Sequence, residues 1–315
     1  MRAFHTIGII GKQEPDTRVP AALQRLLEHL ERRGHRTLLE PATADLLSAG
    51  PDHQGTPSPE GDAHASPYAE LAAQCDLIIV IGGDGTFLHA ARDIARTDTP
   101  LVGINLGRLG FLVDLSPECI ETRLNEILDG HFDVEHRSLL ETRLLGAAAD
   151  ASDREDNWTG KALNEAVISK WDTVRMIEFE TYIDGVFINS QRSDGLIIAT
   201  PTGSTAYALS GGGPLLHPAL DSLLLVSICP HTLSNRPLVV DGASEIEIRL
   251  CHRHAETARL TCDGQVAFSL AEARAVRIRR GQTRVQLLHP RGHDHFQLLR
   301  AKLGWGAHGQ ESPRC

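Results

Sequence analysis

The residues with the clearest chemical potential lie where an apolar run meets a cluster of glycines. Four β-branched residues, Ile78–Ile81, lead directly into Gly82-Gly83-Asp84-Gly85-Thr86. Glycines permit positive φ and let backbone N–H groups approach an anion closely, which is typical of a phosphate-binding turn. A carboxylate in such a turn repels the phosphate. Asp84 therefore indicates chemistry, either by taking up a proton or by helping to hold a metal ion beside the phosphate.

Asn164 and Glu165 form a second candidate pair, directly after a strand-like segment. An Asn side chain can pair with the donor–acceptor edge of adenine, and a Glu side chain can accept hydrogen bonds from ribose hydroxyls. The same two residues would also suit an ordinary solvated turn. Taken alone, the pair does not decide between a nucleoside site and a turn.

A hydroxyl-rich turn follows another apolar strand and continues to Tyr207. Residues 200–205 hold four hydroxyl side chains and one glycine within six positions. Ser204 or Thr205 could serve only as a helix N-cap, but a single cap needs one hydroxyl. The excess of hydroxyls favours a ligand site, in which Tyr207 would either stack on a ring or pack against the protein.

Other polar segments give weaker signals. His231, within Cys229–Pro237, could act as a base, although a single loop histidine is more often structural, and Asp263–Gln265 looks like an ordinary hairpin turn. Cys251–His254 and His289–His295 contain metal-ligand types, but neither has a complete four-ligand spacing, so we expect no protein metal site. The chain has neither a G-x-x-x-x-G-K-[ST] loop nor a G-x-G-x-x-G fingerprint, which leaves a P-loop kinase or a standard Rossmann dehydrogenase unsupported.

The elements that must position these residues begin with a parallel α/β sheet. We expect strands at 6–10, 37–39, 78–82 and 101–105, and helices at about 23–30, 86–96 and 117–129. The stretch from Pro41 to Pro67 is rich in Ala, Gly, Pro and Ser and is expected to be a loop. Asp84 would then lie at the carboxyl end of a buried parallel strand, where open α/β sheets bind their ligands.

After His131 the sequence changes to short β-branched runs separated by turn signals. Strands are expected at 141–145, 166–169, 177–183, 196–199, 246–250, 258–262, 275–278 and 285–288. The fold class is therefore an α/β N-terminal domain with a Rossmann-like parallel sheet plus an all-β C-terminal sandwich domain. We expect domain limits of 1–131 and 132–292, with a tail at 293–315 that returns to the α/β domain.

Bulk composition narrows the function class. The chain has 315 residues, a net charge of -10 and 41% hydrophobic residues, which is typical of a soluble globular protein. The acidic balance argues against broad binding to nucleic acid or to an anionic membrane. Six cysteines without paired spacing indicate reduced thiols, and neither a signal peptide nor a membrane span is evident. We therefore expect a cytoplasmic protein.

Together, the segments above resemble the NAD kinase family. The glycine–aspartate turn, Asn164-Glu165, Asp194 with Thr202–Tyr207, Pro230–Leu233 and Asp263–Gln265 occur in the family's order. The turn alone is shared with diacylglycerol and sphingosine kinases and, more loosely, with phosphofructokinases. The Asn-Glu pair combined with the threonine-rich segment is far more specific, and the resemblance runs from about Ile7 to Gly306.

This resemblance implies a fold, a reaction and partners. The fold is an N-terminal α/β domain with a C-terminal β-sandwich that binds the dinucleotide. The reaction is the phosphorylation of the 2′-hydroxyl of the adenosine ribose of NAD by ATP, which gives NADP. A divalent metal, Mg²⁺ or Mn²⁺, would accompany ATP, and the chain would form a homodimer or a homotetramer. The choice between ATP and polyphosphate as donor, and the acceptance of NADH, stay open.

The resemblance also implies a role for each matching residue. Asp84 would be the general base for the ribose hydroxyl, and Gly85 would help to hold the diphosphate. Asn164 and Glu165 would bind adenine and ribose. The other implied binding residues are Thr205 and Ala206 in the adenine pocket, Asp194 and Tyr207 at the nicotinamide end, Ala208, Leu209 and Ser210 along the same stretch, Arg175 and Arg192 as basic lining, and Cys229 and Gln265 at positions where the family varies.

Two other functions are compatible with parts of this pattern. A lipid kinase of the diacylglycerol or sphingosine type shares the glycine–aspartate turn, but it should present an apolar or basic membrane-facing surface, which an acidic chain does not suggest. A non-catalytic NAD(P) sensor would use the same pocket without transfer. The presence of Asp84 speaks against a sensor, because binding alone gains nothing from a carboxylate there.

Overall fold

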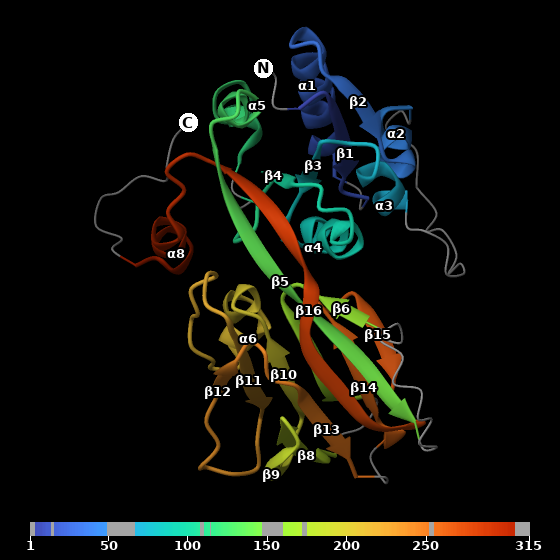
Figure 1. The fold of residues 1–315 in the computed structure, drawn as a ribbon, viewed down its shortest axis with the longest axis vertical. Coiled ribbons are helices and arrows are strands. Elements are labelled where there is room, and N and C mark those ends of the chain that lie inside the picture. The colour runs from blue at the N-terminus through green and yellow to red at the C-terminus, as the bar shows by residue number, and fades with distance from the viewer. Residues whose placement is uncertain are drawn as a thin grey trace. The chain divides into compact units, whose positions relative to one another are not determined.

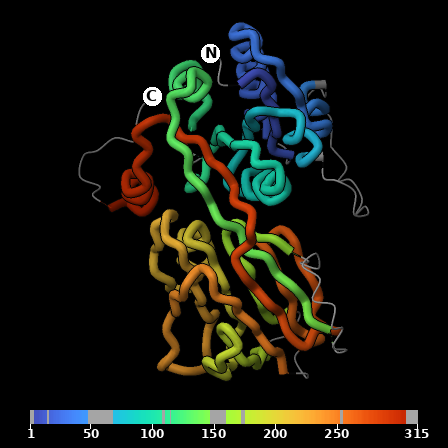
Figure 2. Tube along the Cα trace, in the orientation of Figure 1, coloured from blue at the N-terminus to red at the C-terminus, as the bar shows by residue number. Residues whose placement is uncertain are grey.

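The computed structural model describes residues 4–13, 16–48, 67–107, 110–113, 115–146, 160–171, 175–251 and 255–305. The chain divides into two compact units, Met1–His136 with Val285–Cys315 and Arg137–Arg284 (Figure 1). The first and the last described segments therefore belong to the same unit, as the blue and red ends of the trace show (Figure 2). The sequence-based domain limits stay a prediction. The limit at 131/132 precedes a long strand and the limit at 292/293 follows another, whereas the compact units change inside these strands.

The first unit contains the expected parallel sheet. Its strands are β1 (Thr6–Gly11), β2 (Arg36–Leu39), β3 (Leu77–Gly82) and β4 (Leu101–Asn105), in the order β2-β1-β3-β4. All three pairings among them are parallel, and every residue of β3 is buried. The apolar run before Asp84 is thus a central strand, as the unbroken run of β-branched residues indicated.

Helices and turns of helix connect and flank these strands. They are α1 (Arg18–Arg32), α2 (Pro41–Ser48), α3 (Pro67–Ala72), α4 (Asp84–Ile94), a run of 3-10, π and α turns over η1 (Pro117–Cys119), η2 (Ile120–Leu124) and α5 (Asn125–Leu128), and α8 (His295–Leu303). Leu23, Leu26 and Leu30 of α1 are fully buried in the core, as their spacing predicted. None of the helices in the described ranges is long and apolar enough to cross a membrane.

The expectation of a loop from Pro41 to Pro67 was wrong at its start. Pro41–Ser48 is the helix α2, and residues 49–66 lie outside the described part of the chain. The side chain of Glu40 accepts the backbone N–H groups of Ala42 (3.0 Å) and Thr43 (2.7 Å), which caps the helix. Pro41 occupies the first helical position, where its missing N–H costs nothing. The Pro- and Ala-rich composition hid a helix start that Glu40 and Pro41 mark.

The second unit is a β-sandwich. One sheet has the order β12-β11-β10-β7-β14-β15, and the other contains β16, β13, β8 and β9, with β5 on β16 and β6 on β5. The bounds are β5 (Phe132–Gly146), β6 (Gly160–Ala162), β7 (Glu165–Lys170), β8 (Ile177–Ile183), β9 (Val186–Ser193), β10 (Gly195–Ala199), β11 (Ser222–Ile228), β12 (Leu238–Asp241), β13 (Ile246–Leu250), β14 (Ala258–Cys262), β15 (Val266–Ser269) and β16 (Ala273–Pro290), with the short helices η3 (Thr202–Thr205) and α6 (Tyr207–Ser210). Phe179 and Ile248 from one sheet pack in the same buried cluster as Ile198 and Leu260 from the other. The predicted sandwich is confirmed.

Two strands are longer than the sequence indicated. The expected strands 275–278 and 285–288 are parts of the single strand β16, and 141–145 is the end of the 15-residue β5. The polar segment 279–284, which lay between the two expected strands, continues the strand. Arg279 Nη2 donates to Glu141 Oε2 (3.3 Å), and a side chain at Gly281 would lie 3.1 Å from Glu141 Cγ. Glu141 on β5 therefore bonds to Arg279 and lies close to Gly281, which allows these polar residues to continue the strand.

Candidate active site

In the first unit, β3 ends at Gly82, and Asp84 is the first residue of α4. Its carboxylate accepts two backbone N–H groups, from Phe111 to Oδ2 (2.9 Å) and from Leu112 to Oδ1 (3.2 Å). These bonds hold both oxygens of the side chain at the helix N-terminus, where the partial positive charge of the helix also favours a carboxylate. Gly85, next in the chain, is exposed. Asp84 is therefore a fixed, partly buried carboxylate beside an accessible glycine backbone.

Gly110 makes this arrangement possible. A Cβ atom added to Gly110 would lie 2.0 Å from Asp84 Oδ1, far inside van der Waals contact. A similar constraint holds at Gly82, where a Cβ would lie 2.6 Å from Thr86 Oγ1. The sequence analysis recognised Gly82 within its turn but missed Gly110, whose only signal was a glycine in the loop after β4.

In the second unit, Asp263 holds the segment that contains the Asn-Glu pair. Its Oδ2 accepts the N–H of Leu163 (2.9 Å), and its Oδ1 accepts the N–H groups of Asn164 (2.8 Å) and Glu165 (3.2 Å). Asp263 is 8% exposed and lies with Gly264 in the hairpin between β14 and β15, both at positive φ (51° and 65°). The hairpin is confirmed, but it also carries the carboxylate that orients the candidate nucleoside pair.

Glu165 is buried beside Asp263, and its pKa is raised. Burial, and secondarily the charge of Asp263, raise the pKa of Glu165 to about 8, while a hydrogen bond from the backbone of Tyr207 acts in the opposite direction. Only 7% of the residue is exposed, and its Oε2 has no hydrogen-bond partner among the residues that the structure describes. A buried polar atom without a partner is costly. This oxygen is therefore the strongest structural sign of a missing ligand group.

The hydroxyl-rich turn packs directly on Asn164. Thr200 donates its backbone N–H to Asn164 O (2.9 Å) and its hydroxyl to Leu163 O (2.6 Å). A Cβ at Gly203 would lie 2.2 Å from Asn164 O, so only glycine fits this approach. The structure thus brings the Asn164-Glu165 pair and the start of the 200–207 turn together, as we expected from the sequence.

Most hydroxyls of this turn bond within the protein. Ser204 Oγ donates to Pro201 O (2.7 Å), Thr205 Oγ1 donates to Thr202 O (3.1 Å), and Thr202 Oγ1 accepts from Arg137 Nη1 (3.0 Å). These hydroxyls shape the turn, so their number alone does not indicate a ligand site. Tyr207, which is 45% exposed, follows the turn with its ring accessible.

The remaining predicted residues of this stretch differ in exposure. Ala208 is fully buried in a core cluster, Leu209 is half-buried and Ser210 is exposed. The side chain of Ala208 is therefore occupied by packing against the protein. Gln265 is exposed in the β14–β15 hairpin, beside Asp263, and its backbone N–H donates to Cys262 O (3.0 Å).

A second group of predicted residues lies at the opposite end of β10. Asp194 precedes this strand and pairs with Lys170 Nζ (2.8 Å), whereas Thr200 follows it. Six residues at ~3.3 Å each separate Asp194 from Thr200 by about 20 Å. Arg192 is two residues before Asp194 and lies at the same end, where its carbonyl accepts the N–H of His231 (2.9 Å). Asp194 and Thr200 therefore lie at opposite ends of β10, whereas Ala208, next to Tyr207, packs in the same cluster as Ile197 in the middle of that strand.

Cys229 and Arg175 complete the predicted set. Cys229 follows β11, whose Ile228 carbonyl accepts the N–H of Asp194 (2.9 Å), so it belongs to the same end as Asp194. It is an exposed free thiol at a φ of 46°. Arg175 is exposed just before β8.

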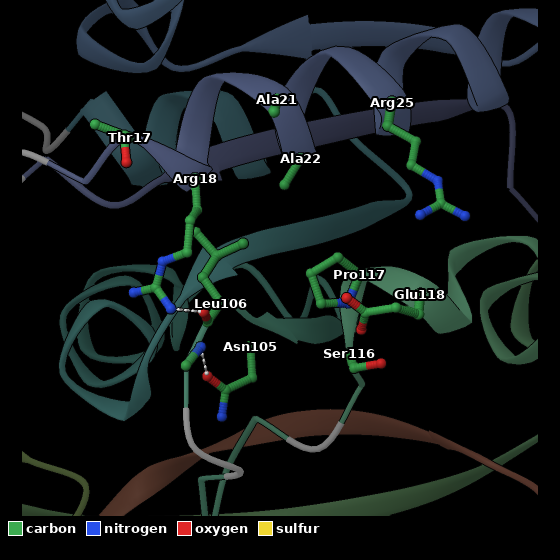
Figure 3. A pocket seen from close by; sticks show the side chains of 11 residues that line it. Thr17, Arg18, Ala21, Ala22, Arg25, Asn105, Leu106, Ser116, Pro117 and Glu118 are labelled. Atoms are coloured by element: carbon green, nitrogen blue, oxygen red, sulfur yellow. Dashed lines mark hydrogen bonds between the residues drawn. The ribbon is translucent and has the colours of Figure 1, made fainter. Parts of the chain in front are cut away.

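The first unit also holds a cavity of about 460 Å³ that the sequence analysis did not anticipate (Figure 3). It lies between the start of α1 and the segment that follows β4, the edge where α/β sheets bind ligands. Arg18 and Arg25 line it, but Arg18 pairs with Asp16 (2.7 Å) and Arg25 Nη2 lies 3.9 Å from Glu121. Both guanidinium groups thus have acidic neighbours, which weakens this cavity as an anion site.

Comparison with known proteins places the chain in one family. Family models of the ATP-NAD kinase N-terminal domain and C-terminal domain match residues 7–132 and 163–290. The NAD kinase of Halorhodospira halophila is 48% identical over 306 residues, which cover 96% of this chain and 94% of that protein. The NAD kinase of Chromohalobacter salexigens is 46% identical over 307 residues, with 98% and 99% covered.

Solved structures agree with these matches. An NAD kinase from Archaeoglobus fulgidus in complex with ATP superposes with a TM-score of 0.71 at 26% identity, covering 95% of this chain and 98% of that one. Yeast NADH kinase complexed with NADH has a TM-score of 0.80 at 22% identity, covering 99% and 94%, and this likeness supports the fold. The chain therefore belongs to the ATP-NAD kinase family.

Proposed function

We propose that the chain transfers the terminal phosphoryl group of ATP to the 2′-hydroxyl of the adenosine ribose of NAD, which yields NADP. That the chain is an NAD kinase follows from relatives that are 44–48% identical over nearly its whole length. The acceptor atom and the residue roles are our proposal. The observation that carries it is the buried Glu165 oxygen beside Asn164, because this pair offers one partner for adenine and one for a ribose hydroxyl.

The second unit would bind the adenosine part of NAD. Asn164 would pair with the adenine edge, while Glu165 would accept a ribose hydroxyl and so satisfy its Oε2. Thr205 and Ala206 would line the adenine pocket, and Tyr207 would offer its exposed ring for stacking. The three backbone bonds to Asp263 support this role, since they fix the main chain from which both side chains project.

Asp84 would act on the nucleophile. Phosphoryl transfer requires positioning, charge neutralisation and a path for the hydroxyl proton, without a covalent protein intermediate. The Asp84 carboxylate would take that proton from the ribose 2′-hydroxyl, a contribution of about 10²–10⁴-fold in rate. The N–H groups of Phe111 and Leu112 orient it, and Gly85 would let the diphosphate approach the main chain.

A divalent ion carried with ATP fits the donor atoms present. Carboxylate oxygens are the ligands that Mg²⁺ and Mn²⁺ take. Each Asp84 oxygen accepts one backbone N–H and so retains acceptor capacity toward an ion. When bound, the ion would neutralise charge on the donor phosphates.

The proposal includes a homodimer or homotetramer. Asp194 is separated from Thr200, which hydrogen-bonds to Asn164, by the length of β10, about 20 Å at ~3.3 Å for each residue. This separation supports an assembly in which Arg192 and Asp194 contact a dinucleotide bound by another copy. Mixing Asp84→Asn protein with Asp194→Ala protein, each nearly inactive alone, should then restore activity in mixed oligomers, while mixtures without recovery would contradict this arrangement.

Location and domain limits remain part of the same proposal. The expectation of reduced thiols holds only in part, because Cys75, Cys229, Cys251 and Cys262 are free thiols whereas Cys119 is disulfide-bonded, and the cytoplasmic location is kept as a prediction from the sequence. We retain 1–131, 132–292 and 293–315 as the division into domains, with the tail belonging to the α/β domain.

One assay tests the reaction. Purified protein with NAD, ATP and Mg²⁺ should form NADP, and Asp84→Asn should lower kcat by about 10²–10⁴-fold with little change in the KM for NAD. Asp93→Asn, in the same helix, is the matched control and should leave kcat unchanged. NAD binding without NADP formation by the native chain would indicate a sensor. Phosphorylation of diacylglycerol or sphingosine instead of NAD would indicate a lipid kinase, and parallel assays with polyphosphate and NADH define donor and acceptor range.

A further inference from the structure

Three side chains of the first unit that the proposed reaction does not use converge on one point. Glu135 lies on β5, His289 lies near the end of β16, and His293 lies in the turn that leads into α8. One ligand atom from each lies within 4.8 Å of the others. The His289–His295 segment lacks a complete ligand set by itself, and the further ligand, Glu135, comes from a strand far earlier in the chain.

One pair of side chains in this cluster already has the spacing of two ligands on one ion. His289 Nε2 lies 3.2 Å from Glu135 Oε2, and the rings of His289 and His293 stack with centroids 3.9 Å apart. Ligand atoms bound tetrahedrally at ~2.1 Å from one ion are about 3.4 Å apart. The His289–Glu135 pair already meets this spacing. The two imidazole planes are inclined by only 21°, so a rotation of the His293 side chain would be needed to aim its nitrogen at a shared ion.

The surroundings hold the three segments in place. Asp133 Oδ2, on the same strand as Glu135, accepts the N–H of Gly292 (3.0 Å), which fastens the turn before His293 across 159 residues of sequence. His289 is 4% exposed and His293 is half-buried, so the cluster is shielded but reachable from solvent. Two imidazoles and one carboxylate, with a fourth position open to water, form a known zinc ligand set.

We propose that Glu135, His289 and His293 bind a divalent transition-metal ion of the Zn²⁺ type. The ion fastens the start of α8 to β5 and β16. Imidazole nitrogen suits Zn²⁺ better than it suits Mg²⁺, which prefers oxygen ligands, so this site is chemically distinct from a Mg²⁺ position on the ATP phosphates.

Zinc titration of the full-length chain tests the site. After dialysis against a chelator, Zn²⁺ is titrated in competition with a chromophoric chelator, and Co²⁺ is substituted to record its visible ligand-field absorption. The native chain should bind one ion, show tetrahedral Co²⁺ bands and gain thermal stability with Zn²⁺. His293→Ala, a partly exposed position that should fold, is expected to weaken Zn²⁺ binding at least about tenfold and to remove both the Co²⁺ bands and the stabilisation.

His131→Ala is the matched control, since it removes an exposed histidine of the same unit outside the cluster. It should bind Zn²⁺ as the native chain does. The proposal is overturned if the native chain binds no stoichiometric Zn²⁺, or if His293→Ala binds it equally well, because cysteines or other histidines would then hold the ion.

Discussion

Replacing Asp263 by Asn should disturb the proposed nucleoside site without changing any side chain that we propose to contact the ligand. Asp263 accepts three backbone N–H groups, one on Oδ2 and two on Oδ1. An amide keeps only one of these oxygens and turns an NH₂ donor toward the remaining N–H. If the amide oxygen keeps the hydrogen bonds from the N–H groups of Asn164 and Glu165, the buried N–H of Leu163 loses its acceptor. This loss should lower the free energy of unfolding by about 1–3 kcal/mol.

The same substitution also changes the pH dependence of stability. Burial and the charge of Asp263 raise the pKa of Glu165 from 4.5 to about 8, so between these values the folded chain holds a proton that the unfolded chain has released. The stabilisation from this proton is complete below pH 4.5 and is lost as the pH rises toward 8. The unfolding free energy should therefore fall by up to about 1.4 kcal/mol per pH unit. Asp263→Asn removes the smaller of the two causes, so the decline should end at a lower pH.

Urea unfolding at several pH values between 5 and 8, together with the KM for NAD, measures both effects. Asp184→Asn is a closely matched control. Asp184 also begins an Asp-Gly hairpin at positive φ (50°) and accepts a backbone N–H, from Glu245 (2.8 Å), but it is exposed and lies between β8 and β9. The KM for NAD should rise only in Asp263→Asn. An unchanged pH slope and an unchanged KM in Asp263→Asn would refute the reasoning.

Three further substitutions test other parts of the site. In a steady-state assay, Gly110→Ala should displace the Asp84 carboxylate and lower kcat by about 10²-fold, since a displacement of ~1 Å can cost that much. Gly107→Ala in the same loop is the control. Its Cβ would meet only Asn105 Oδ1, at 3.8 Å, so its kcat should be nearly unchanged. Gly203→Ala should press on Asn164 O and raise the KM for NAD, while Gly146→Ala, with open space around it, should not; equal KM values would remove Gly203 from the site. In isothermal titrations, NAD affinity should rise as the pH approaches about 8, because the ionised Glu165 carboxylate is a stronger hydrogen-bond acceptor than the protonated form. Glu165→Gln should flatten this rise. If the rise persists in the variant, another titrating group causes it.

Sequence reasoning succeeded where the signal was local. The run Ile78–Ile81 marked a central strand, and the strands at 246–250 and 258–262 match β13 and β14 residue for residue. The apolar pattern of these segments is a direct result of the burial of their side chains in the core. The family's order of motifs then identified the α/β domain, the sandwich and the enzyme class, which the structure and the relatives confirm.

Sequence reasoning failed where a residue's role depends on a distant main chain. Gly110 and Asp263 matter because a carboxylate meets backbone atoms that are far away in sequence, and no residue type signals such a contact. Arg279 fell between two expected strands, because its partner Glu141 is on another strand and no local pattern signals that contact. The separation of Asp194 from Thr200 depends on the length of β10, which lies between them and which the order of motifs does not reveal.

The hold on Asp84 has a consequence for how this site tolerates mutation. Its two donors are main-chain N–H groups, so the side chains at Phe111 and Leu112 can be exchanged while both bonds persist. An alanine scan would leave both bonds in place, although Leu112→Ala would cost stability because Leu112 is buried. A proline scan would find them, because proline alone removes the N–H. Asp84 can therefore keep its orientation while the side chains of the loop that binds it are substituted, except at Gly110, where a Cβ would clash with the carboxylate.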